Sequence, residues 1–276
     1  MSLDAALART FGASPRDQTR VSGGDIHEAW RVTLADGRVV FVKTHPRPPR
    51  GVYEAEADGL SFLAEGPLRV PRVLAAEPSF LALEWLEPAR RVADFDERLG
   101  RGLAALHRAQ PASFGHVRDN FLGPLPQPNE PADDWPTFYA ERRLAPMLAR
   151  SRADASLRRR FDRLYARLPE LCGPPEPPAR LHGDLWGGNL HVDERGEPAL
   201  IDPAVYGGHR EIDLAMMRLF GGFSSRVFAA YEEVHPLAPG HEERVALYQL
   251  YPLLVHAVLF GGGYLSRVAS IVDTLV

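Results

Sequence analysis

The sequence predicts a mixed α+β fold of two lobes, with a β-rich N-terminal lobe and a mainly helical C-terminal lobe. In the first third of the chain, the apolar segments are short, rich in β-branched residues and separated by glycine turns, a pattern typical of strands. From residue 95 onward the apolar spacing is mainly helical. We therefore expect a join near residues 86–89, which divides the chain into lobes of residues 1–88 and 89–276.

Short strands surround one helix in the predicted N-terminal lobe. The Asp-Gly pair at 36–37 predicts a hairpin turn, and the strand that returns from it ends at Lys43. The proline-rich segment 47–51 can be neither helix nor central strand. A helix is predicted over residues 52–65, where a Gly-Pro pair stops it. The predicted strands cover residues 21–24, 28–34, 38–43, 70–75 and 80–85.

The predicted C-terminal lobe contains one small β-hairpin among its helices. Short apolar segments at 189–192 and 199–201 flank the polar turn 193–196. A second proline-rich segment, 173–178, precedes this hairpin and separates it from the helical pattern before it. The apolar stretch 250–260 predicts a buried core helix, because it is shorter than the roughly 20 residues that cross a bilayer.

Composition excludes several classes of protein. The 276 residues carry a net charge of -4 and are 45% hydrophobic, the balance of an ordinary globular protein. We expect neither nucleic acid nor membrane as a partner, and we interpret the arginine cluster within 158–167 as a solvated helix face. Cys172 is the only cysteine and cannot form an intramolecular disulfide, and residues 1–10 lack the pattern of a signal peptide. We therefore expect a cytoplasmic protein.

The most specific chemical motif lies around the second hairpin. Asp184 and Asn189 are five positions apart, as in the catalytic loop of a kinase, and Asp202 ends the returning strand. In that chemistry one carboxylate orients the attacking hydroxyl and accepts its proton, while an amide and a second carboxylate hold Mg²⁺ on the phosphates of ATP. Each residue alone could simply cap a turn. All three at this spacing favour the functional interpretation.

The predicted N-terminal lobe supplies candidates for the nucleotide phosphates. Gly23 and Gly24 lie between strands, where glycine lets backbone N–H groups approach a phosphate closely. Thirty-two residues are lysine or arginine, and Lys43 is the only lysine among them, which indicates a site that needs a compact ammonium. Glu56, on the following helix, is its expected ion-pair partner, with Glu54 as the competing candidate.

Residues 83–86 end the last predicted strand before the join between the lobes. We expect this segment, which includes Glu84 and Leu86, to be a hinge whose backbone pairs with adenine. The alternative is an ordinary edge strand.

These residues carry a resemblance. The His182-Gly183-Asp184 triplet with Asn189 and Asp202 resembles the phosphotransferase branch of the protein-kinase-like fold, shared by aminoglycoside and choline kinases. Longer stretches resemble the fructosamine kinase (ketosamine 3-kinase) family across nearly the whole chain. They are DNFLGPLPQPN (119–129), DWPTFYAERRL (134–144), LHGDLWGGN (181–189), IDPAVYGGHREIDLAM (201–216), LFGGF (219–223), LYQLYPLL (247–254) and FGGGY (260–264).

The resemblance implies ATP- and Mg²⁺-dependent phosphorylation of O3 of a ketosamine, which promotes release of the amine. By position it implies that Asp184 is the catalytic base and that Asn189 and Asp202 bind Mg²⁺. It also implies that Lys43 with Glu56 organises the phosphates. In the same way, Asp213 is implied to be a buried acid that braces the catalytic loop.

The resemblance further implies a substrate pocket near Trp186, His209, Arg210 and Glu211. Trp186 has core packing as its alternative, and Arg210 with Glu211 could instead form an ion pair. The acceptor can be a small-molecule or a protein-bound ketosamine, and the sequence predicts no oligomeric state. Two rival functions are another small-molecule kinase, acting on an aminoglycoside, choline or homoserine, and a nucleotide-binding module without catalysis.

Overall fold

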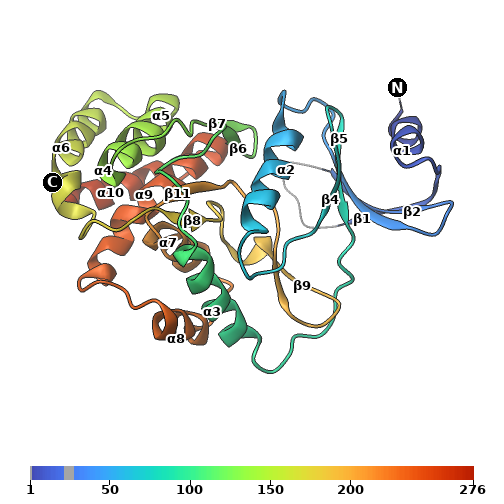
Figure 1. Cartoon of the computed structure of the whole chain (residues 1–276). Helices are drawn as coiled ribbons and strands as arrows, with labels where there is room; N and C mark the ends of the chain where they lie inside the picture. Colours follow the sequence, from blue (N-terminus) through green and yellow to red (C-terminus); the bar gives the residue numbers. More distant parts are fainter. Residues whose placement is uncertain (1, 22–27) are drawn as a thin grey trace.

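A five-stranded antiparallel sheet forms the N-terminal part of the computed structural model, which describes residues 2–21 and 28–276 (Figure 1). Its strand order is β1-β2-β3-β5-β4. β5 therefore lies between two neighbours, and the alternative of an ordinary edge strand for residues 83–86 is wrong, because Leu83 and Glu84 end this central strand and the other two residues follow it. The strands are β1 (Pro15–Val21), β2 (Glu28–Leu34), β3 (Val39–Thr44), β4 (Val73–Glu77) and β5 (Phe80–Glu84).

The two faces of this sheet are covered by different helices. On β3, Val40 and Val42 point to one face and pack in a cluster with α1 (Leu3–Phe11). Side chains alternate along a strand, so Phe41 and Lys43 point to the opposite face. That face is covered by α2 (Val52–Leu63). Because of this alternation, Lys43 points toward α2, the helix that carries Glu56.

α2 also contacts the C-terminal part of the molecule along its length. The His116 ring lies 2.6 Å from the carboxylate of Asp58 on this helix. The guanidinium of Arg180 donates to the backbone oxygen of Phe62 near the helix end. Leu63 packs in a core cluster with helices of the C-terminal part. α2 is thus fixed between the sheet and the helical body.

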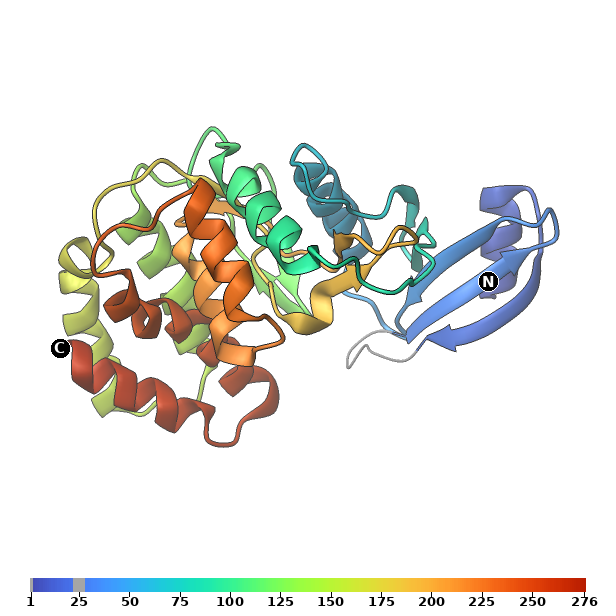
Figure 2. The same cartoon turned by 90° about the horizontal axis from the view of Figure 1, so that it is seen from below.

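The C-terminal part is mainly helical, and Figure 2 shows it at the opposite end of the molecule from the sheet and α1. α9 (His241–Phe260) has ten buried residues and contains Pro252, so the core helix predicted over 250–260 is present and longer than expected. The other helices are α3 (Phe95–Arg108), α4 (Trp135–Phe138), the π-helical η1 (Tyr139–Leu144), α5 (Ala145–Arg150), α6 (Ala155–Leu171), α7 (Glu211–Phe220), α8 (Ser225–Val234) and α10 (Tyr264–Leu275).

Three short two-stranded sheets interrupt these helices. One of them is the hairpin predicted over residues 189–201, formed by β9 and β10. The pairs are β6 (Asn120–Leu122) with β7 (Leu125–Gln127), β8 (Ala179–Leu181) with β11 (Tyr206–Gly208), and β9 (Leu190–Val192) with β10 (Pro198–Leu200), and the 3-10 turn η2 (Gly187–Asn189) precedes β9.

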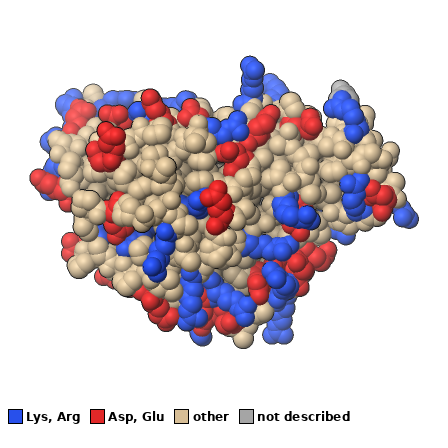
Figure 3. All heavy atoms as spheres, viewed as in Figure 1, with Lys and Arg blue, Asp and Glu red and all other residues tan. Residues whose placement is uncertain are grey.

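The structure confirms the predicted α+β class. It differs from the sequence prediction near the N-terminus and in the C-terminal part, where the β6–β7 and β8–β11 pairs were not expected beside the one predicted hairpin. Neither α1 nor most of β1 was expected, because the side chains of 16–20 are polar and exposed and show no alternation. β4 begins three residues later than predicted, at Val73. In the described part of the chain no helix is both long and apolar enough to cross a membrane. Cationic and anionic side chains are interspersed over the face seen in Figure 3.

Candidate active site

A cavity of about 390 Å³ lies where β3 and α2 face α7 and α9. Its polar end contains the charged residues of the sheet and of the loop before β9. Its other end is apolar and aromatic. Six residues predicted from the sequence line it, namely Lys43, Glu56, Asp184, Trp186, Asn189 and Asp202.

Lys43 is the cation at the polar end. Its Nζ donates to both carboxylate oxygens of Glu56, at 3.0 and 2.9 Å, and to Asp202 Oδ1 at 3.0 Å. Only 7% of its surface is exposed. Glu54, the competing candidate, is two positions before Glu56 and therefore projects from a different face of α2. Its backbone oxygen accepts a hydrogen bond from Arg118. The ion-pair partner of Lys43 on this helix is therefore Glu56.

The three charges of this cluster shift one another's pKa values. Burial alone would lower the pKa of Lys43, but the carboxylates of Asp202 and Glu56 raise it above its usual range. Burial raises the pKa of Glu56 to about 7, against the opposing effect of Lys43. Desolvation also acts on Asp202, yet the adjacent Lys43 charge keeps the pKa of this carboxyl below its usual range. Lys43 is therefore a fully protonated cation held between two acids.

Asp184 lies in residues 182–189, which we call the catalytic loop after their predicted role and which enter the cavity after β8. Gly183 has a φ of 80°, and a Cβ there would lie 2.0 Å from the backbone oxygen of Ala204, so only glycine fits this turn. Asn189 Nδ2 donates to the backbone oxygen of Asp184 at 2.8 Å and to its Oδ2 at 3.1 Å. Burial raises the pKa of Asp184 to about 7, although the hydrogen bond from Asn189 acts in the opposite direction.

Asp202 follows β10 with a φ of 53°, and among the described residues it is the only non-glycine with a positive φ. Such a conformation costs about 1 kcal/mol and is concentrated at functional sites. Its carboxylate and the amide oxygen of Asn189 are hard oxygen donors of the kind that Mg²⁺ prefers. No group of three or more His, Cys, Asp or Glu in the described ranges could hold a metal. This donor set fits a Mg²⁺ ion whose remaining ligands are phosphate oxygens and water.

Asp213, in the first turn of α7, supports the catalytic loop from behind. Its two carboxylate oxygens accept hydrogen bonds from the backbone N–H groups of His182, at 2.7 Å, and Gly183, at 3.0 Å. His107 Nε2 lies 3.4 Å from the same carboxylate, and its Nδ1 is 2.9 Å from the hydroxyl of Tyr231. Sequence reasoning missed His107 and Tyr231, because nothing in the local pattern of α3 or α8 marks them as partners of a distant loop.

Trp186 lines the cavity and is 38% exposed, so it is not a core-packing residue. Its ring lies over Gly188, where a Cβ would come within 2.3 Å of the indole. The aromatic end continues with Phe220 and His256, whose rings stack with centroids 4.4 Å apart. Sequence reasoning missed this wall, because its members come from four separate segments. Phe260 and Tyr264 complete it.

His209, Arg210 and Glu211 are absent from the residues that line this cavity. Arg210 forms a two-pronged ion pair with Glu176, with both contacts at 2.8 Å. Glu211 instead pairs with Arg244, at 2.6 Å.

The structure therefore gives no support to direct contact between these three residues and a substrate in this cavity. The alternative, an ion pair between Arg210 and Glu211, is wrong, because each side chain pairs with a different residue. His209 is buried, and its ring stacks on that of Tyr248 with centroids 5.1 Å apart. The three residues anchor the start of α7.

The predicted hinge residues are engaged in contacts within the protein. Glu84 donates its backbone N–H to the oxygen of Arg72 at 2.8 Å. The backbone oxygen of Leu86 accepts a hydrogen bond from His191 Nε2 at 3.0 Å. Pairing of this segment with adenine therefore stays a prediction. Gly23 and Gly24 lie outside the described residues.

Comparison with known proteins gives consistent matches over the whole chain. A model of the family described as fructosamine kinase matches residues 2–276. A probable ketoamine kinase of Synechocystis is 42% identical over 268 residues, covering 94% of this chain and 90% of that one. A probable ketoamine kinase of Thermus thermophilus is 44% identical, covering 88% of each chain. The chloroplastic protein-ribulosamine 3-kinase of Oryza sativa subsp. japonica is 36% identical, covering 92% of this chain and 77% of that one.

Solved structures extend the comparison to the fold. A candidate fructosamine-3-kinase from Thermobifida fusca superposes with a TM-score of 0.90 at 39% identity, covering 99% of this chain and 98% of that one. A macrolide 2′-phosphotransferase of type I superposes with a TM-score of 0.65 at 20% identity, covering 98% and 94%. At that identity the likeness concerns the fold alone, which is the fold of kinase-like phosphotransferases.

Proposed function

This chain belongs to the fructosamine kinase family, and we propose that it transfers the γ-phosphoryl group of ATP, with Mg²⁺, to the O3 hydroxyl of a ketosamine. The observation that supports this most is the convergence of Lys43, Glu56 and Asp202 beside Asp184 and Asn189 in one cavity. Phosphoryl transfer needs a cation for the phosphates, oxygen ligands for a metal and a carboxylate for the attacking hydroxyl. The cavity brings these groups together.

In this mechanism Asp184 accepts the proton of the O3 hydroxyl as the bond from O3 to the γ-phosphorus forms. The bond from that phosphorus to the bridging oxygen breaks in the same step, and ADP leaves. A carboxyl whose burial raises its pKa to about 7 can take up and release a proton near neutral pH. Lys43, held by Glu56, places one ammonium against the phosphates of the nucleotide. Asn189 and Asp202 would hold Mg²⁺, which neutralises charge on those phosphates.

The acceptor enters from the aromatic end of the cavity. Ketosamines carry a sugar with several hydroxyls next to an amine that is protonated near neutral pH. Aromatic faces such as that of Trp186 attract a cation and stack on the apolar side of a sugar ring. Phe260 is 56% exposed at the rim, so a group attached to the amine can extend past it into solvent. This arrangement is compatible with a small-molecule or a protein-bound ketosamine.

The reaction takes place in the cytoplasm. The free thiol of Cys172 is buried and burial raises its pKa, which suits a structural cysteine in a reducing compartment.

The test is a comparison of rates on free and protein-bound fructosamine and ribulosamine, with ADP release and phosphate incorporation measured together. We expect incorporation into at least one ketosamine, and its loss when a chelator removes Mg²⁺. An aminoglycoside and choline serve as controls for another small-molecule kinase. Binding of Mg·ATP without phosphorylation of any ketosamine would contradict the proposal and leave a nucleotide-binding module.

A further inference from the structure

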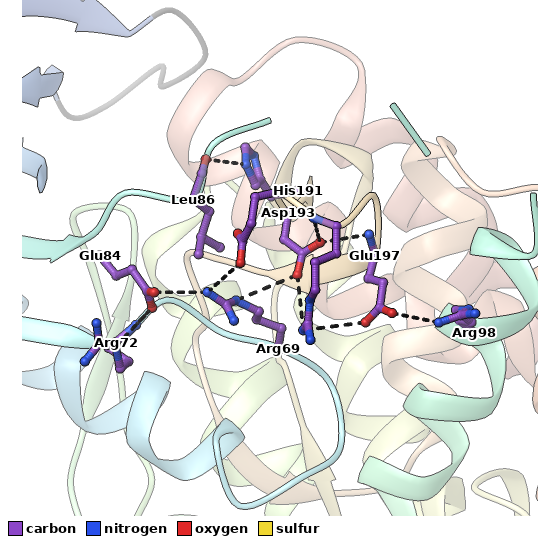
Figure 4. A network of polar contacts seen from close by, with 10 residues as sticks. Arg69, Arg72, Glu84, Leu86, Arg98, His191, Asp193 and Glu197 are labelled. Atoms are coloured by element: carbon purple, nitrogen blue, oxygen red, sulfur yellow. Dashed lines mark hydrogen bonds and ion pairs between the residues drawn. The ribbon is translucent and has the colours of Figure 1, made fainter. Parts of the chain in front are cut away.

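A network of ion pairs joins the sheet to the β9–β10 hairpin, on the side of the molecule where the chain passes between its two parts (Figure 4). Arg69, in the segment between α2 and β4, is at its centre. The guanidinium lies 3.0 Å from Glu84 Oε1, at the end of β5, and 3.4 Å from Glu194 Oε1, in the hairpin turn. One side chain therefore bridges the two parts.

The main chain of Arg69 strengthens this bridge. Its backbone oxygen accepts a hydrogen bond from the N–H of Leu200 on β10 at 2.8 Å. Its Nε faces Asp193 Oδ2 at 3.9 Å, and these two solvent-shielded atoms have no hydrogen-bond partner within the described ranges. Arg69 thus contacts both the last strand of the hairpin and the start of its turn.

The hairpin turn is a rigid partner for Arg69. The carboxylate of Asp193 is fully buried, and its Oδ1 accepts hydrogen bonds from the backbone N–H groups of Arg195 and Glu197, both at 2.9 Å. Glu197 pairs in turn with Arg98 of α3 at 2.7 Å. The turn is therefore held to the helical body on the side away from Arg69.

On the other side, the position of Glu84 is linked to that of Lys43. β5 pairs with β3 so that Glu84 lies opposite Val40 and Leu81 lies opposite Lys43. Arg72 also donates its backbone N–H to Glu84 Oε2, at 3.2 Å, which fixes the carboxylate at the end of the strand. A displacement of Glu84 therefore carries Lys43 with it.

Along the chain, the hairpin lies between Asn189 and Asp202, the two residues that would hold the metal. β9 begins directly after Asn189, and β10 ends two residues before Asp202. We propose that Arg69 is a positioning residue for the nucleotide, because it sets the distance from Lys43 on the sheet to Asn189 and Asp202 on the helical body. This inference rests on the proposed nucleotide site, and it gives Glu84 a structural role beside its expected one at the adenine.

The test compares Arg69→Met with Arg101→Met, which removes an arginine from an exposed ion pair with Glu233. Calorimetry measures the affinity for the magnesium complex of AMP-PNP, a non-hydrolysable ATP analogue, and steady-state kinetics measure KM for ATP and for the ketosamine separately. In Arg69→Met we expect the affinity to fall and the KM for ATP to rise about fivefold, with little change in the KM for the ketosamine. Arg69→Lys should recover part of the loss, because an ammonium keeps the charge but lacks the planar fork of donors with which the guanidinium faces the carboxylates.

Arg101→Met should bind the analogue as the unaltered protein does. If Arg69→Met does not fold, Glu194→Gln removes a half-exposed partner of Arg69 and should give a smaller shift in the same direction. Equal affinity of folded Arg69→Met and the unaltered protein would overturn the inference and leave the proposed function standing. Failure of the unaltered protein to bind the analogue would overturn both.

Discussion

Lys43 and Asp202 are 159 positions apart in the chain, and Lys43 Nζ donates a hydrogen bond to Asp202 Oδ1 at 3.0 Å. The other two contacts of the ammonium are with Glu56, so all three of its donors are used within the protein. A nucleotide phosphate can bind Lys43 only by replacing one of these partners. We expect Asp202 to be replaced, because its carboxylate is the one that a metal would engage.

Lys43→Arg should lower kcat/KM by about 100-fold. A guanidinium is larger and planar, and at a buried site it would displace the phosphates by about an ångström. The measurement is steady-state kinetics with ATP, with thermal unfolding as a check on the fold. Arg101→Lys is the matched exchange at an exposed position and should change neither quantity measurably. Full activity in Lys43→Arg would show that this site tolerates either cation.

Asp184→Asn should retain nucleotide binding and lose turnover by about 100-fold or more, the usual contribution of a general base. The amide is nearly the same size and can still accept the hydrogen bond that Asn189 donates to the Asp184 side chain. Calorimetry with a nucleotide analogue and single-turnover kinetics separate the two effects. Unchanged turnover would remove Asp184 from the role of base.

Gly188→Ala should raise the KM for the ketosamine and leave the KM for ATP nearly unchanged. The new methyl group would meet the Trp186 ring at 2.3 Å, so the indole must move from its place in the cavity wall. Trp186→Leu, which removes the ring, should shift the same constant in the same direction. Equal changes in both KM values would instead indicate a general disturbance of the catalytic loop.

His209 should make the fold sensitive to acid. Burial lowers the pKa of this histidine from 6.5 to about 4, so between these two pH values the unfolded chain binds a proton that the folded chain does not. Stability therefore rises with pH across this window and falls as the pH is lowered through it. The contribution is at most about 1.4 kcal/mol per pH unit.

Urea unfolding at pH 7 and pH 5 checks this. His209→Phe keeps a ring against Tyr248 and cannot titrate, so its free energy of unfolding should fall by about 2 kcal/mol less than that of the unaltered protein over this interval. Equal losses in the two proteins would show that His209 is protonated in the folded state as readily as in the unfolded one.

The sequence predicted those parts of the site whose geometry is local. Five positions separate Asp184 from Asn189 in a tight loop, and strand alternation determines which face of β3 carries Lys43. The kinase pattern favoured Glu56 over Glu54 as the ion-pair partner of Lys43. The hydrogen bonds from Lys43 to Glu56 confirm this preference. Each of these expectations depends on the conformation of a few neighbouring residues.

Contacts between distant segments could not be predicted in this way. Arg210 pairs with Glu176, 34 positions earlier, because the loop before β8 passes over the start of α7. The adjacent Glu211 was the simpler candidate and was wrong. The aromatic wall shows the same limit, because Trp186 and Phe260 lie 74 positions apart in the sequence and come to line one cavity only in the folded chain.

The burial of Lys43 has a chemical consequence for the protein itself. Glycation by reducing sugars and labelling by amine-selective reagents both require an accessible, unprotonated amine. The only ε-amino group of this chain is 7% exposed and is held as a cation between two acids. The α-amino group is therefore the only amine of this chain that such reagents can reach. Glycation produces the ketosamines that we propose as substrates, and it has almost no target on this protein.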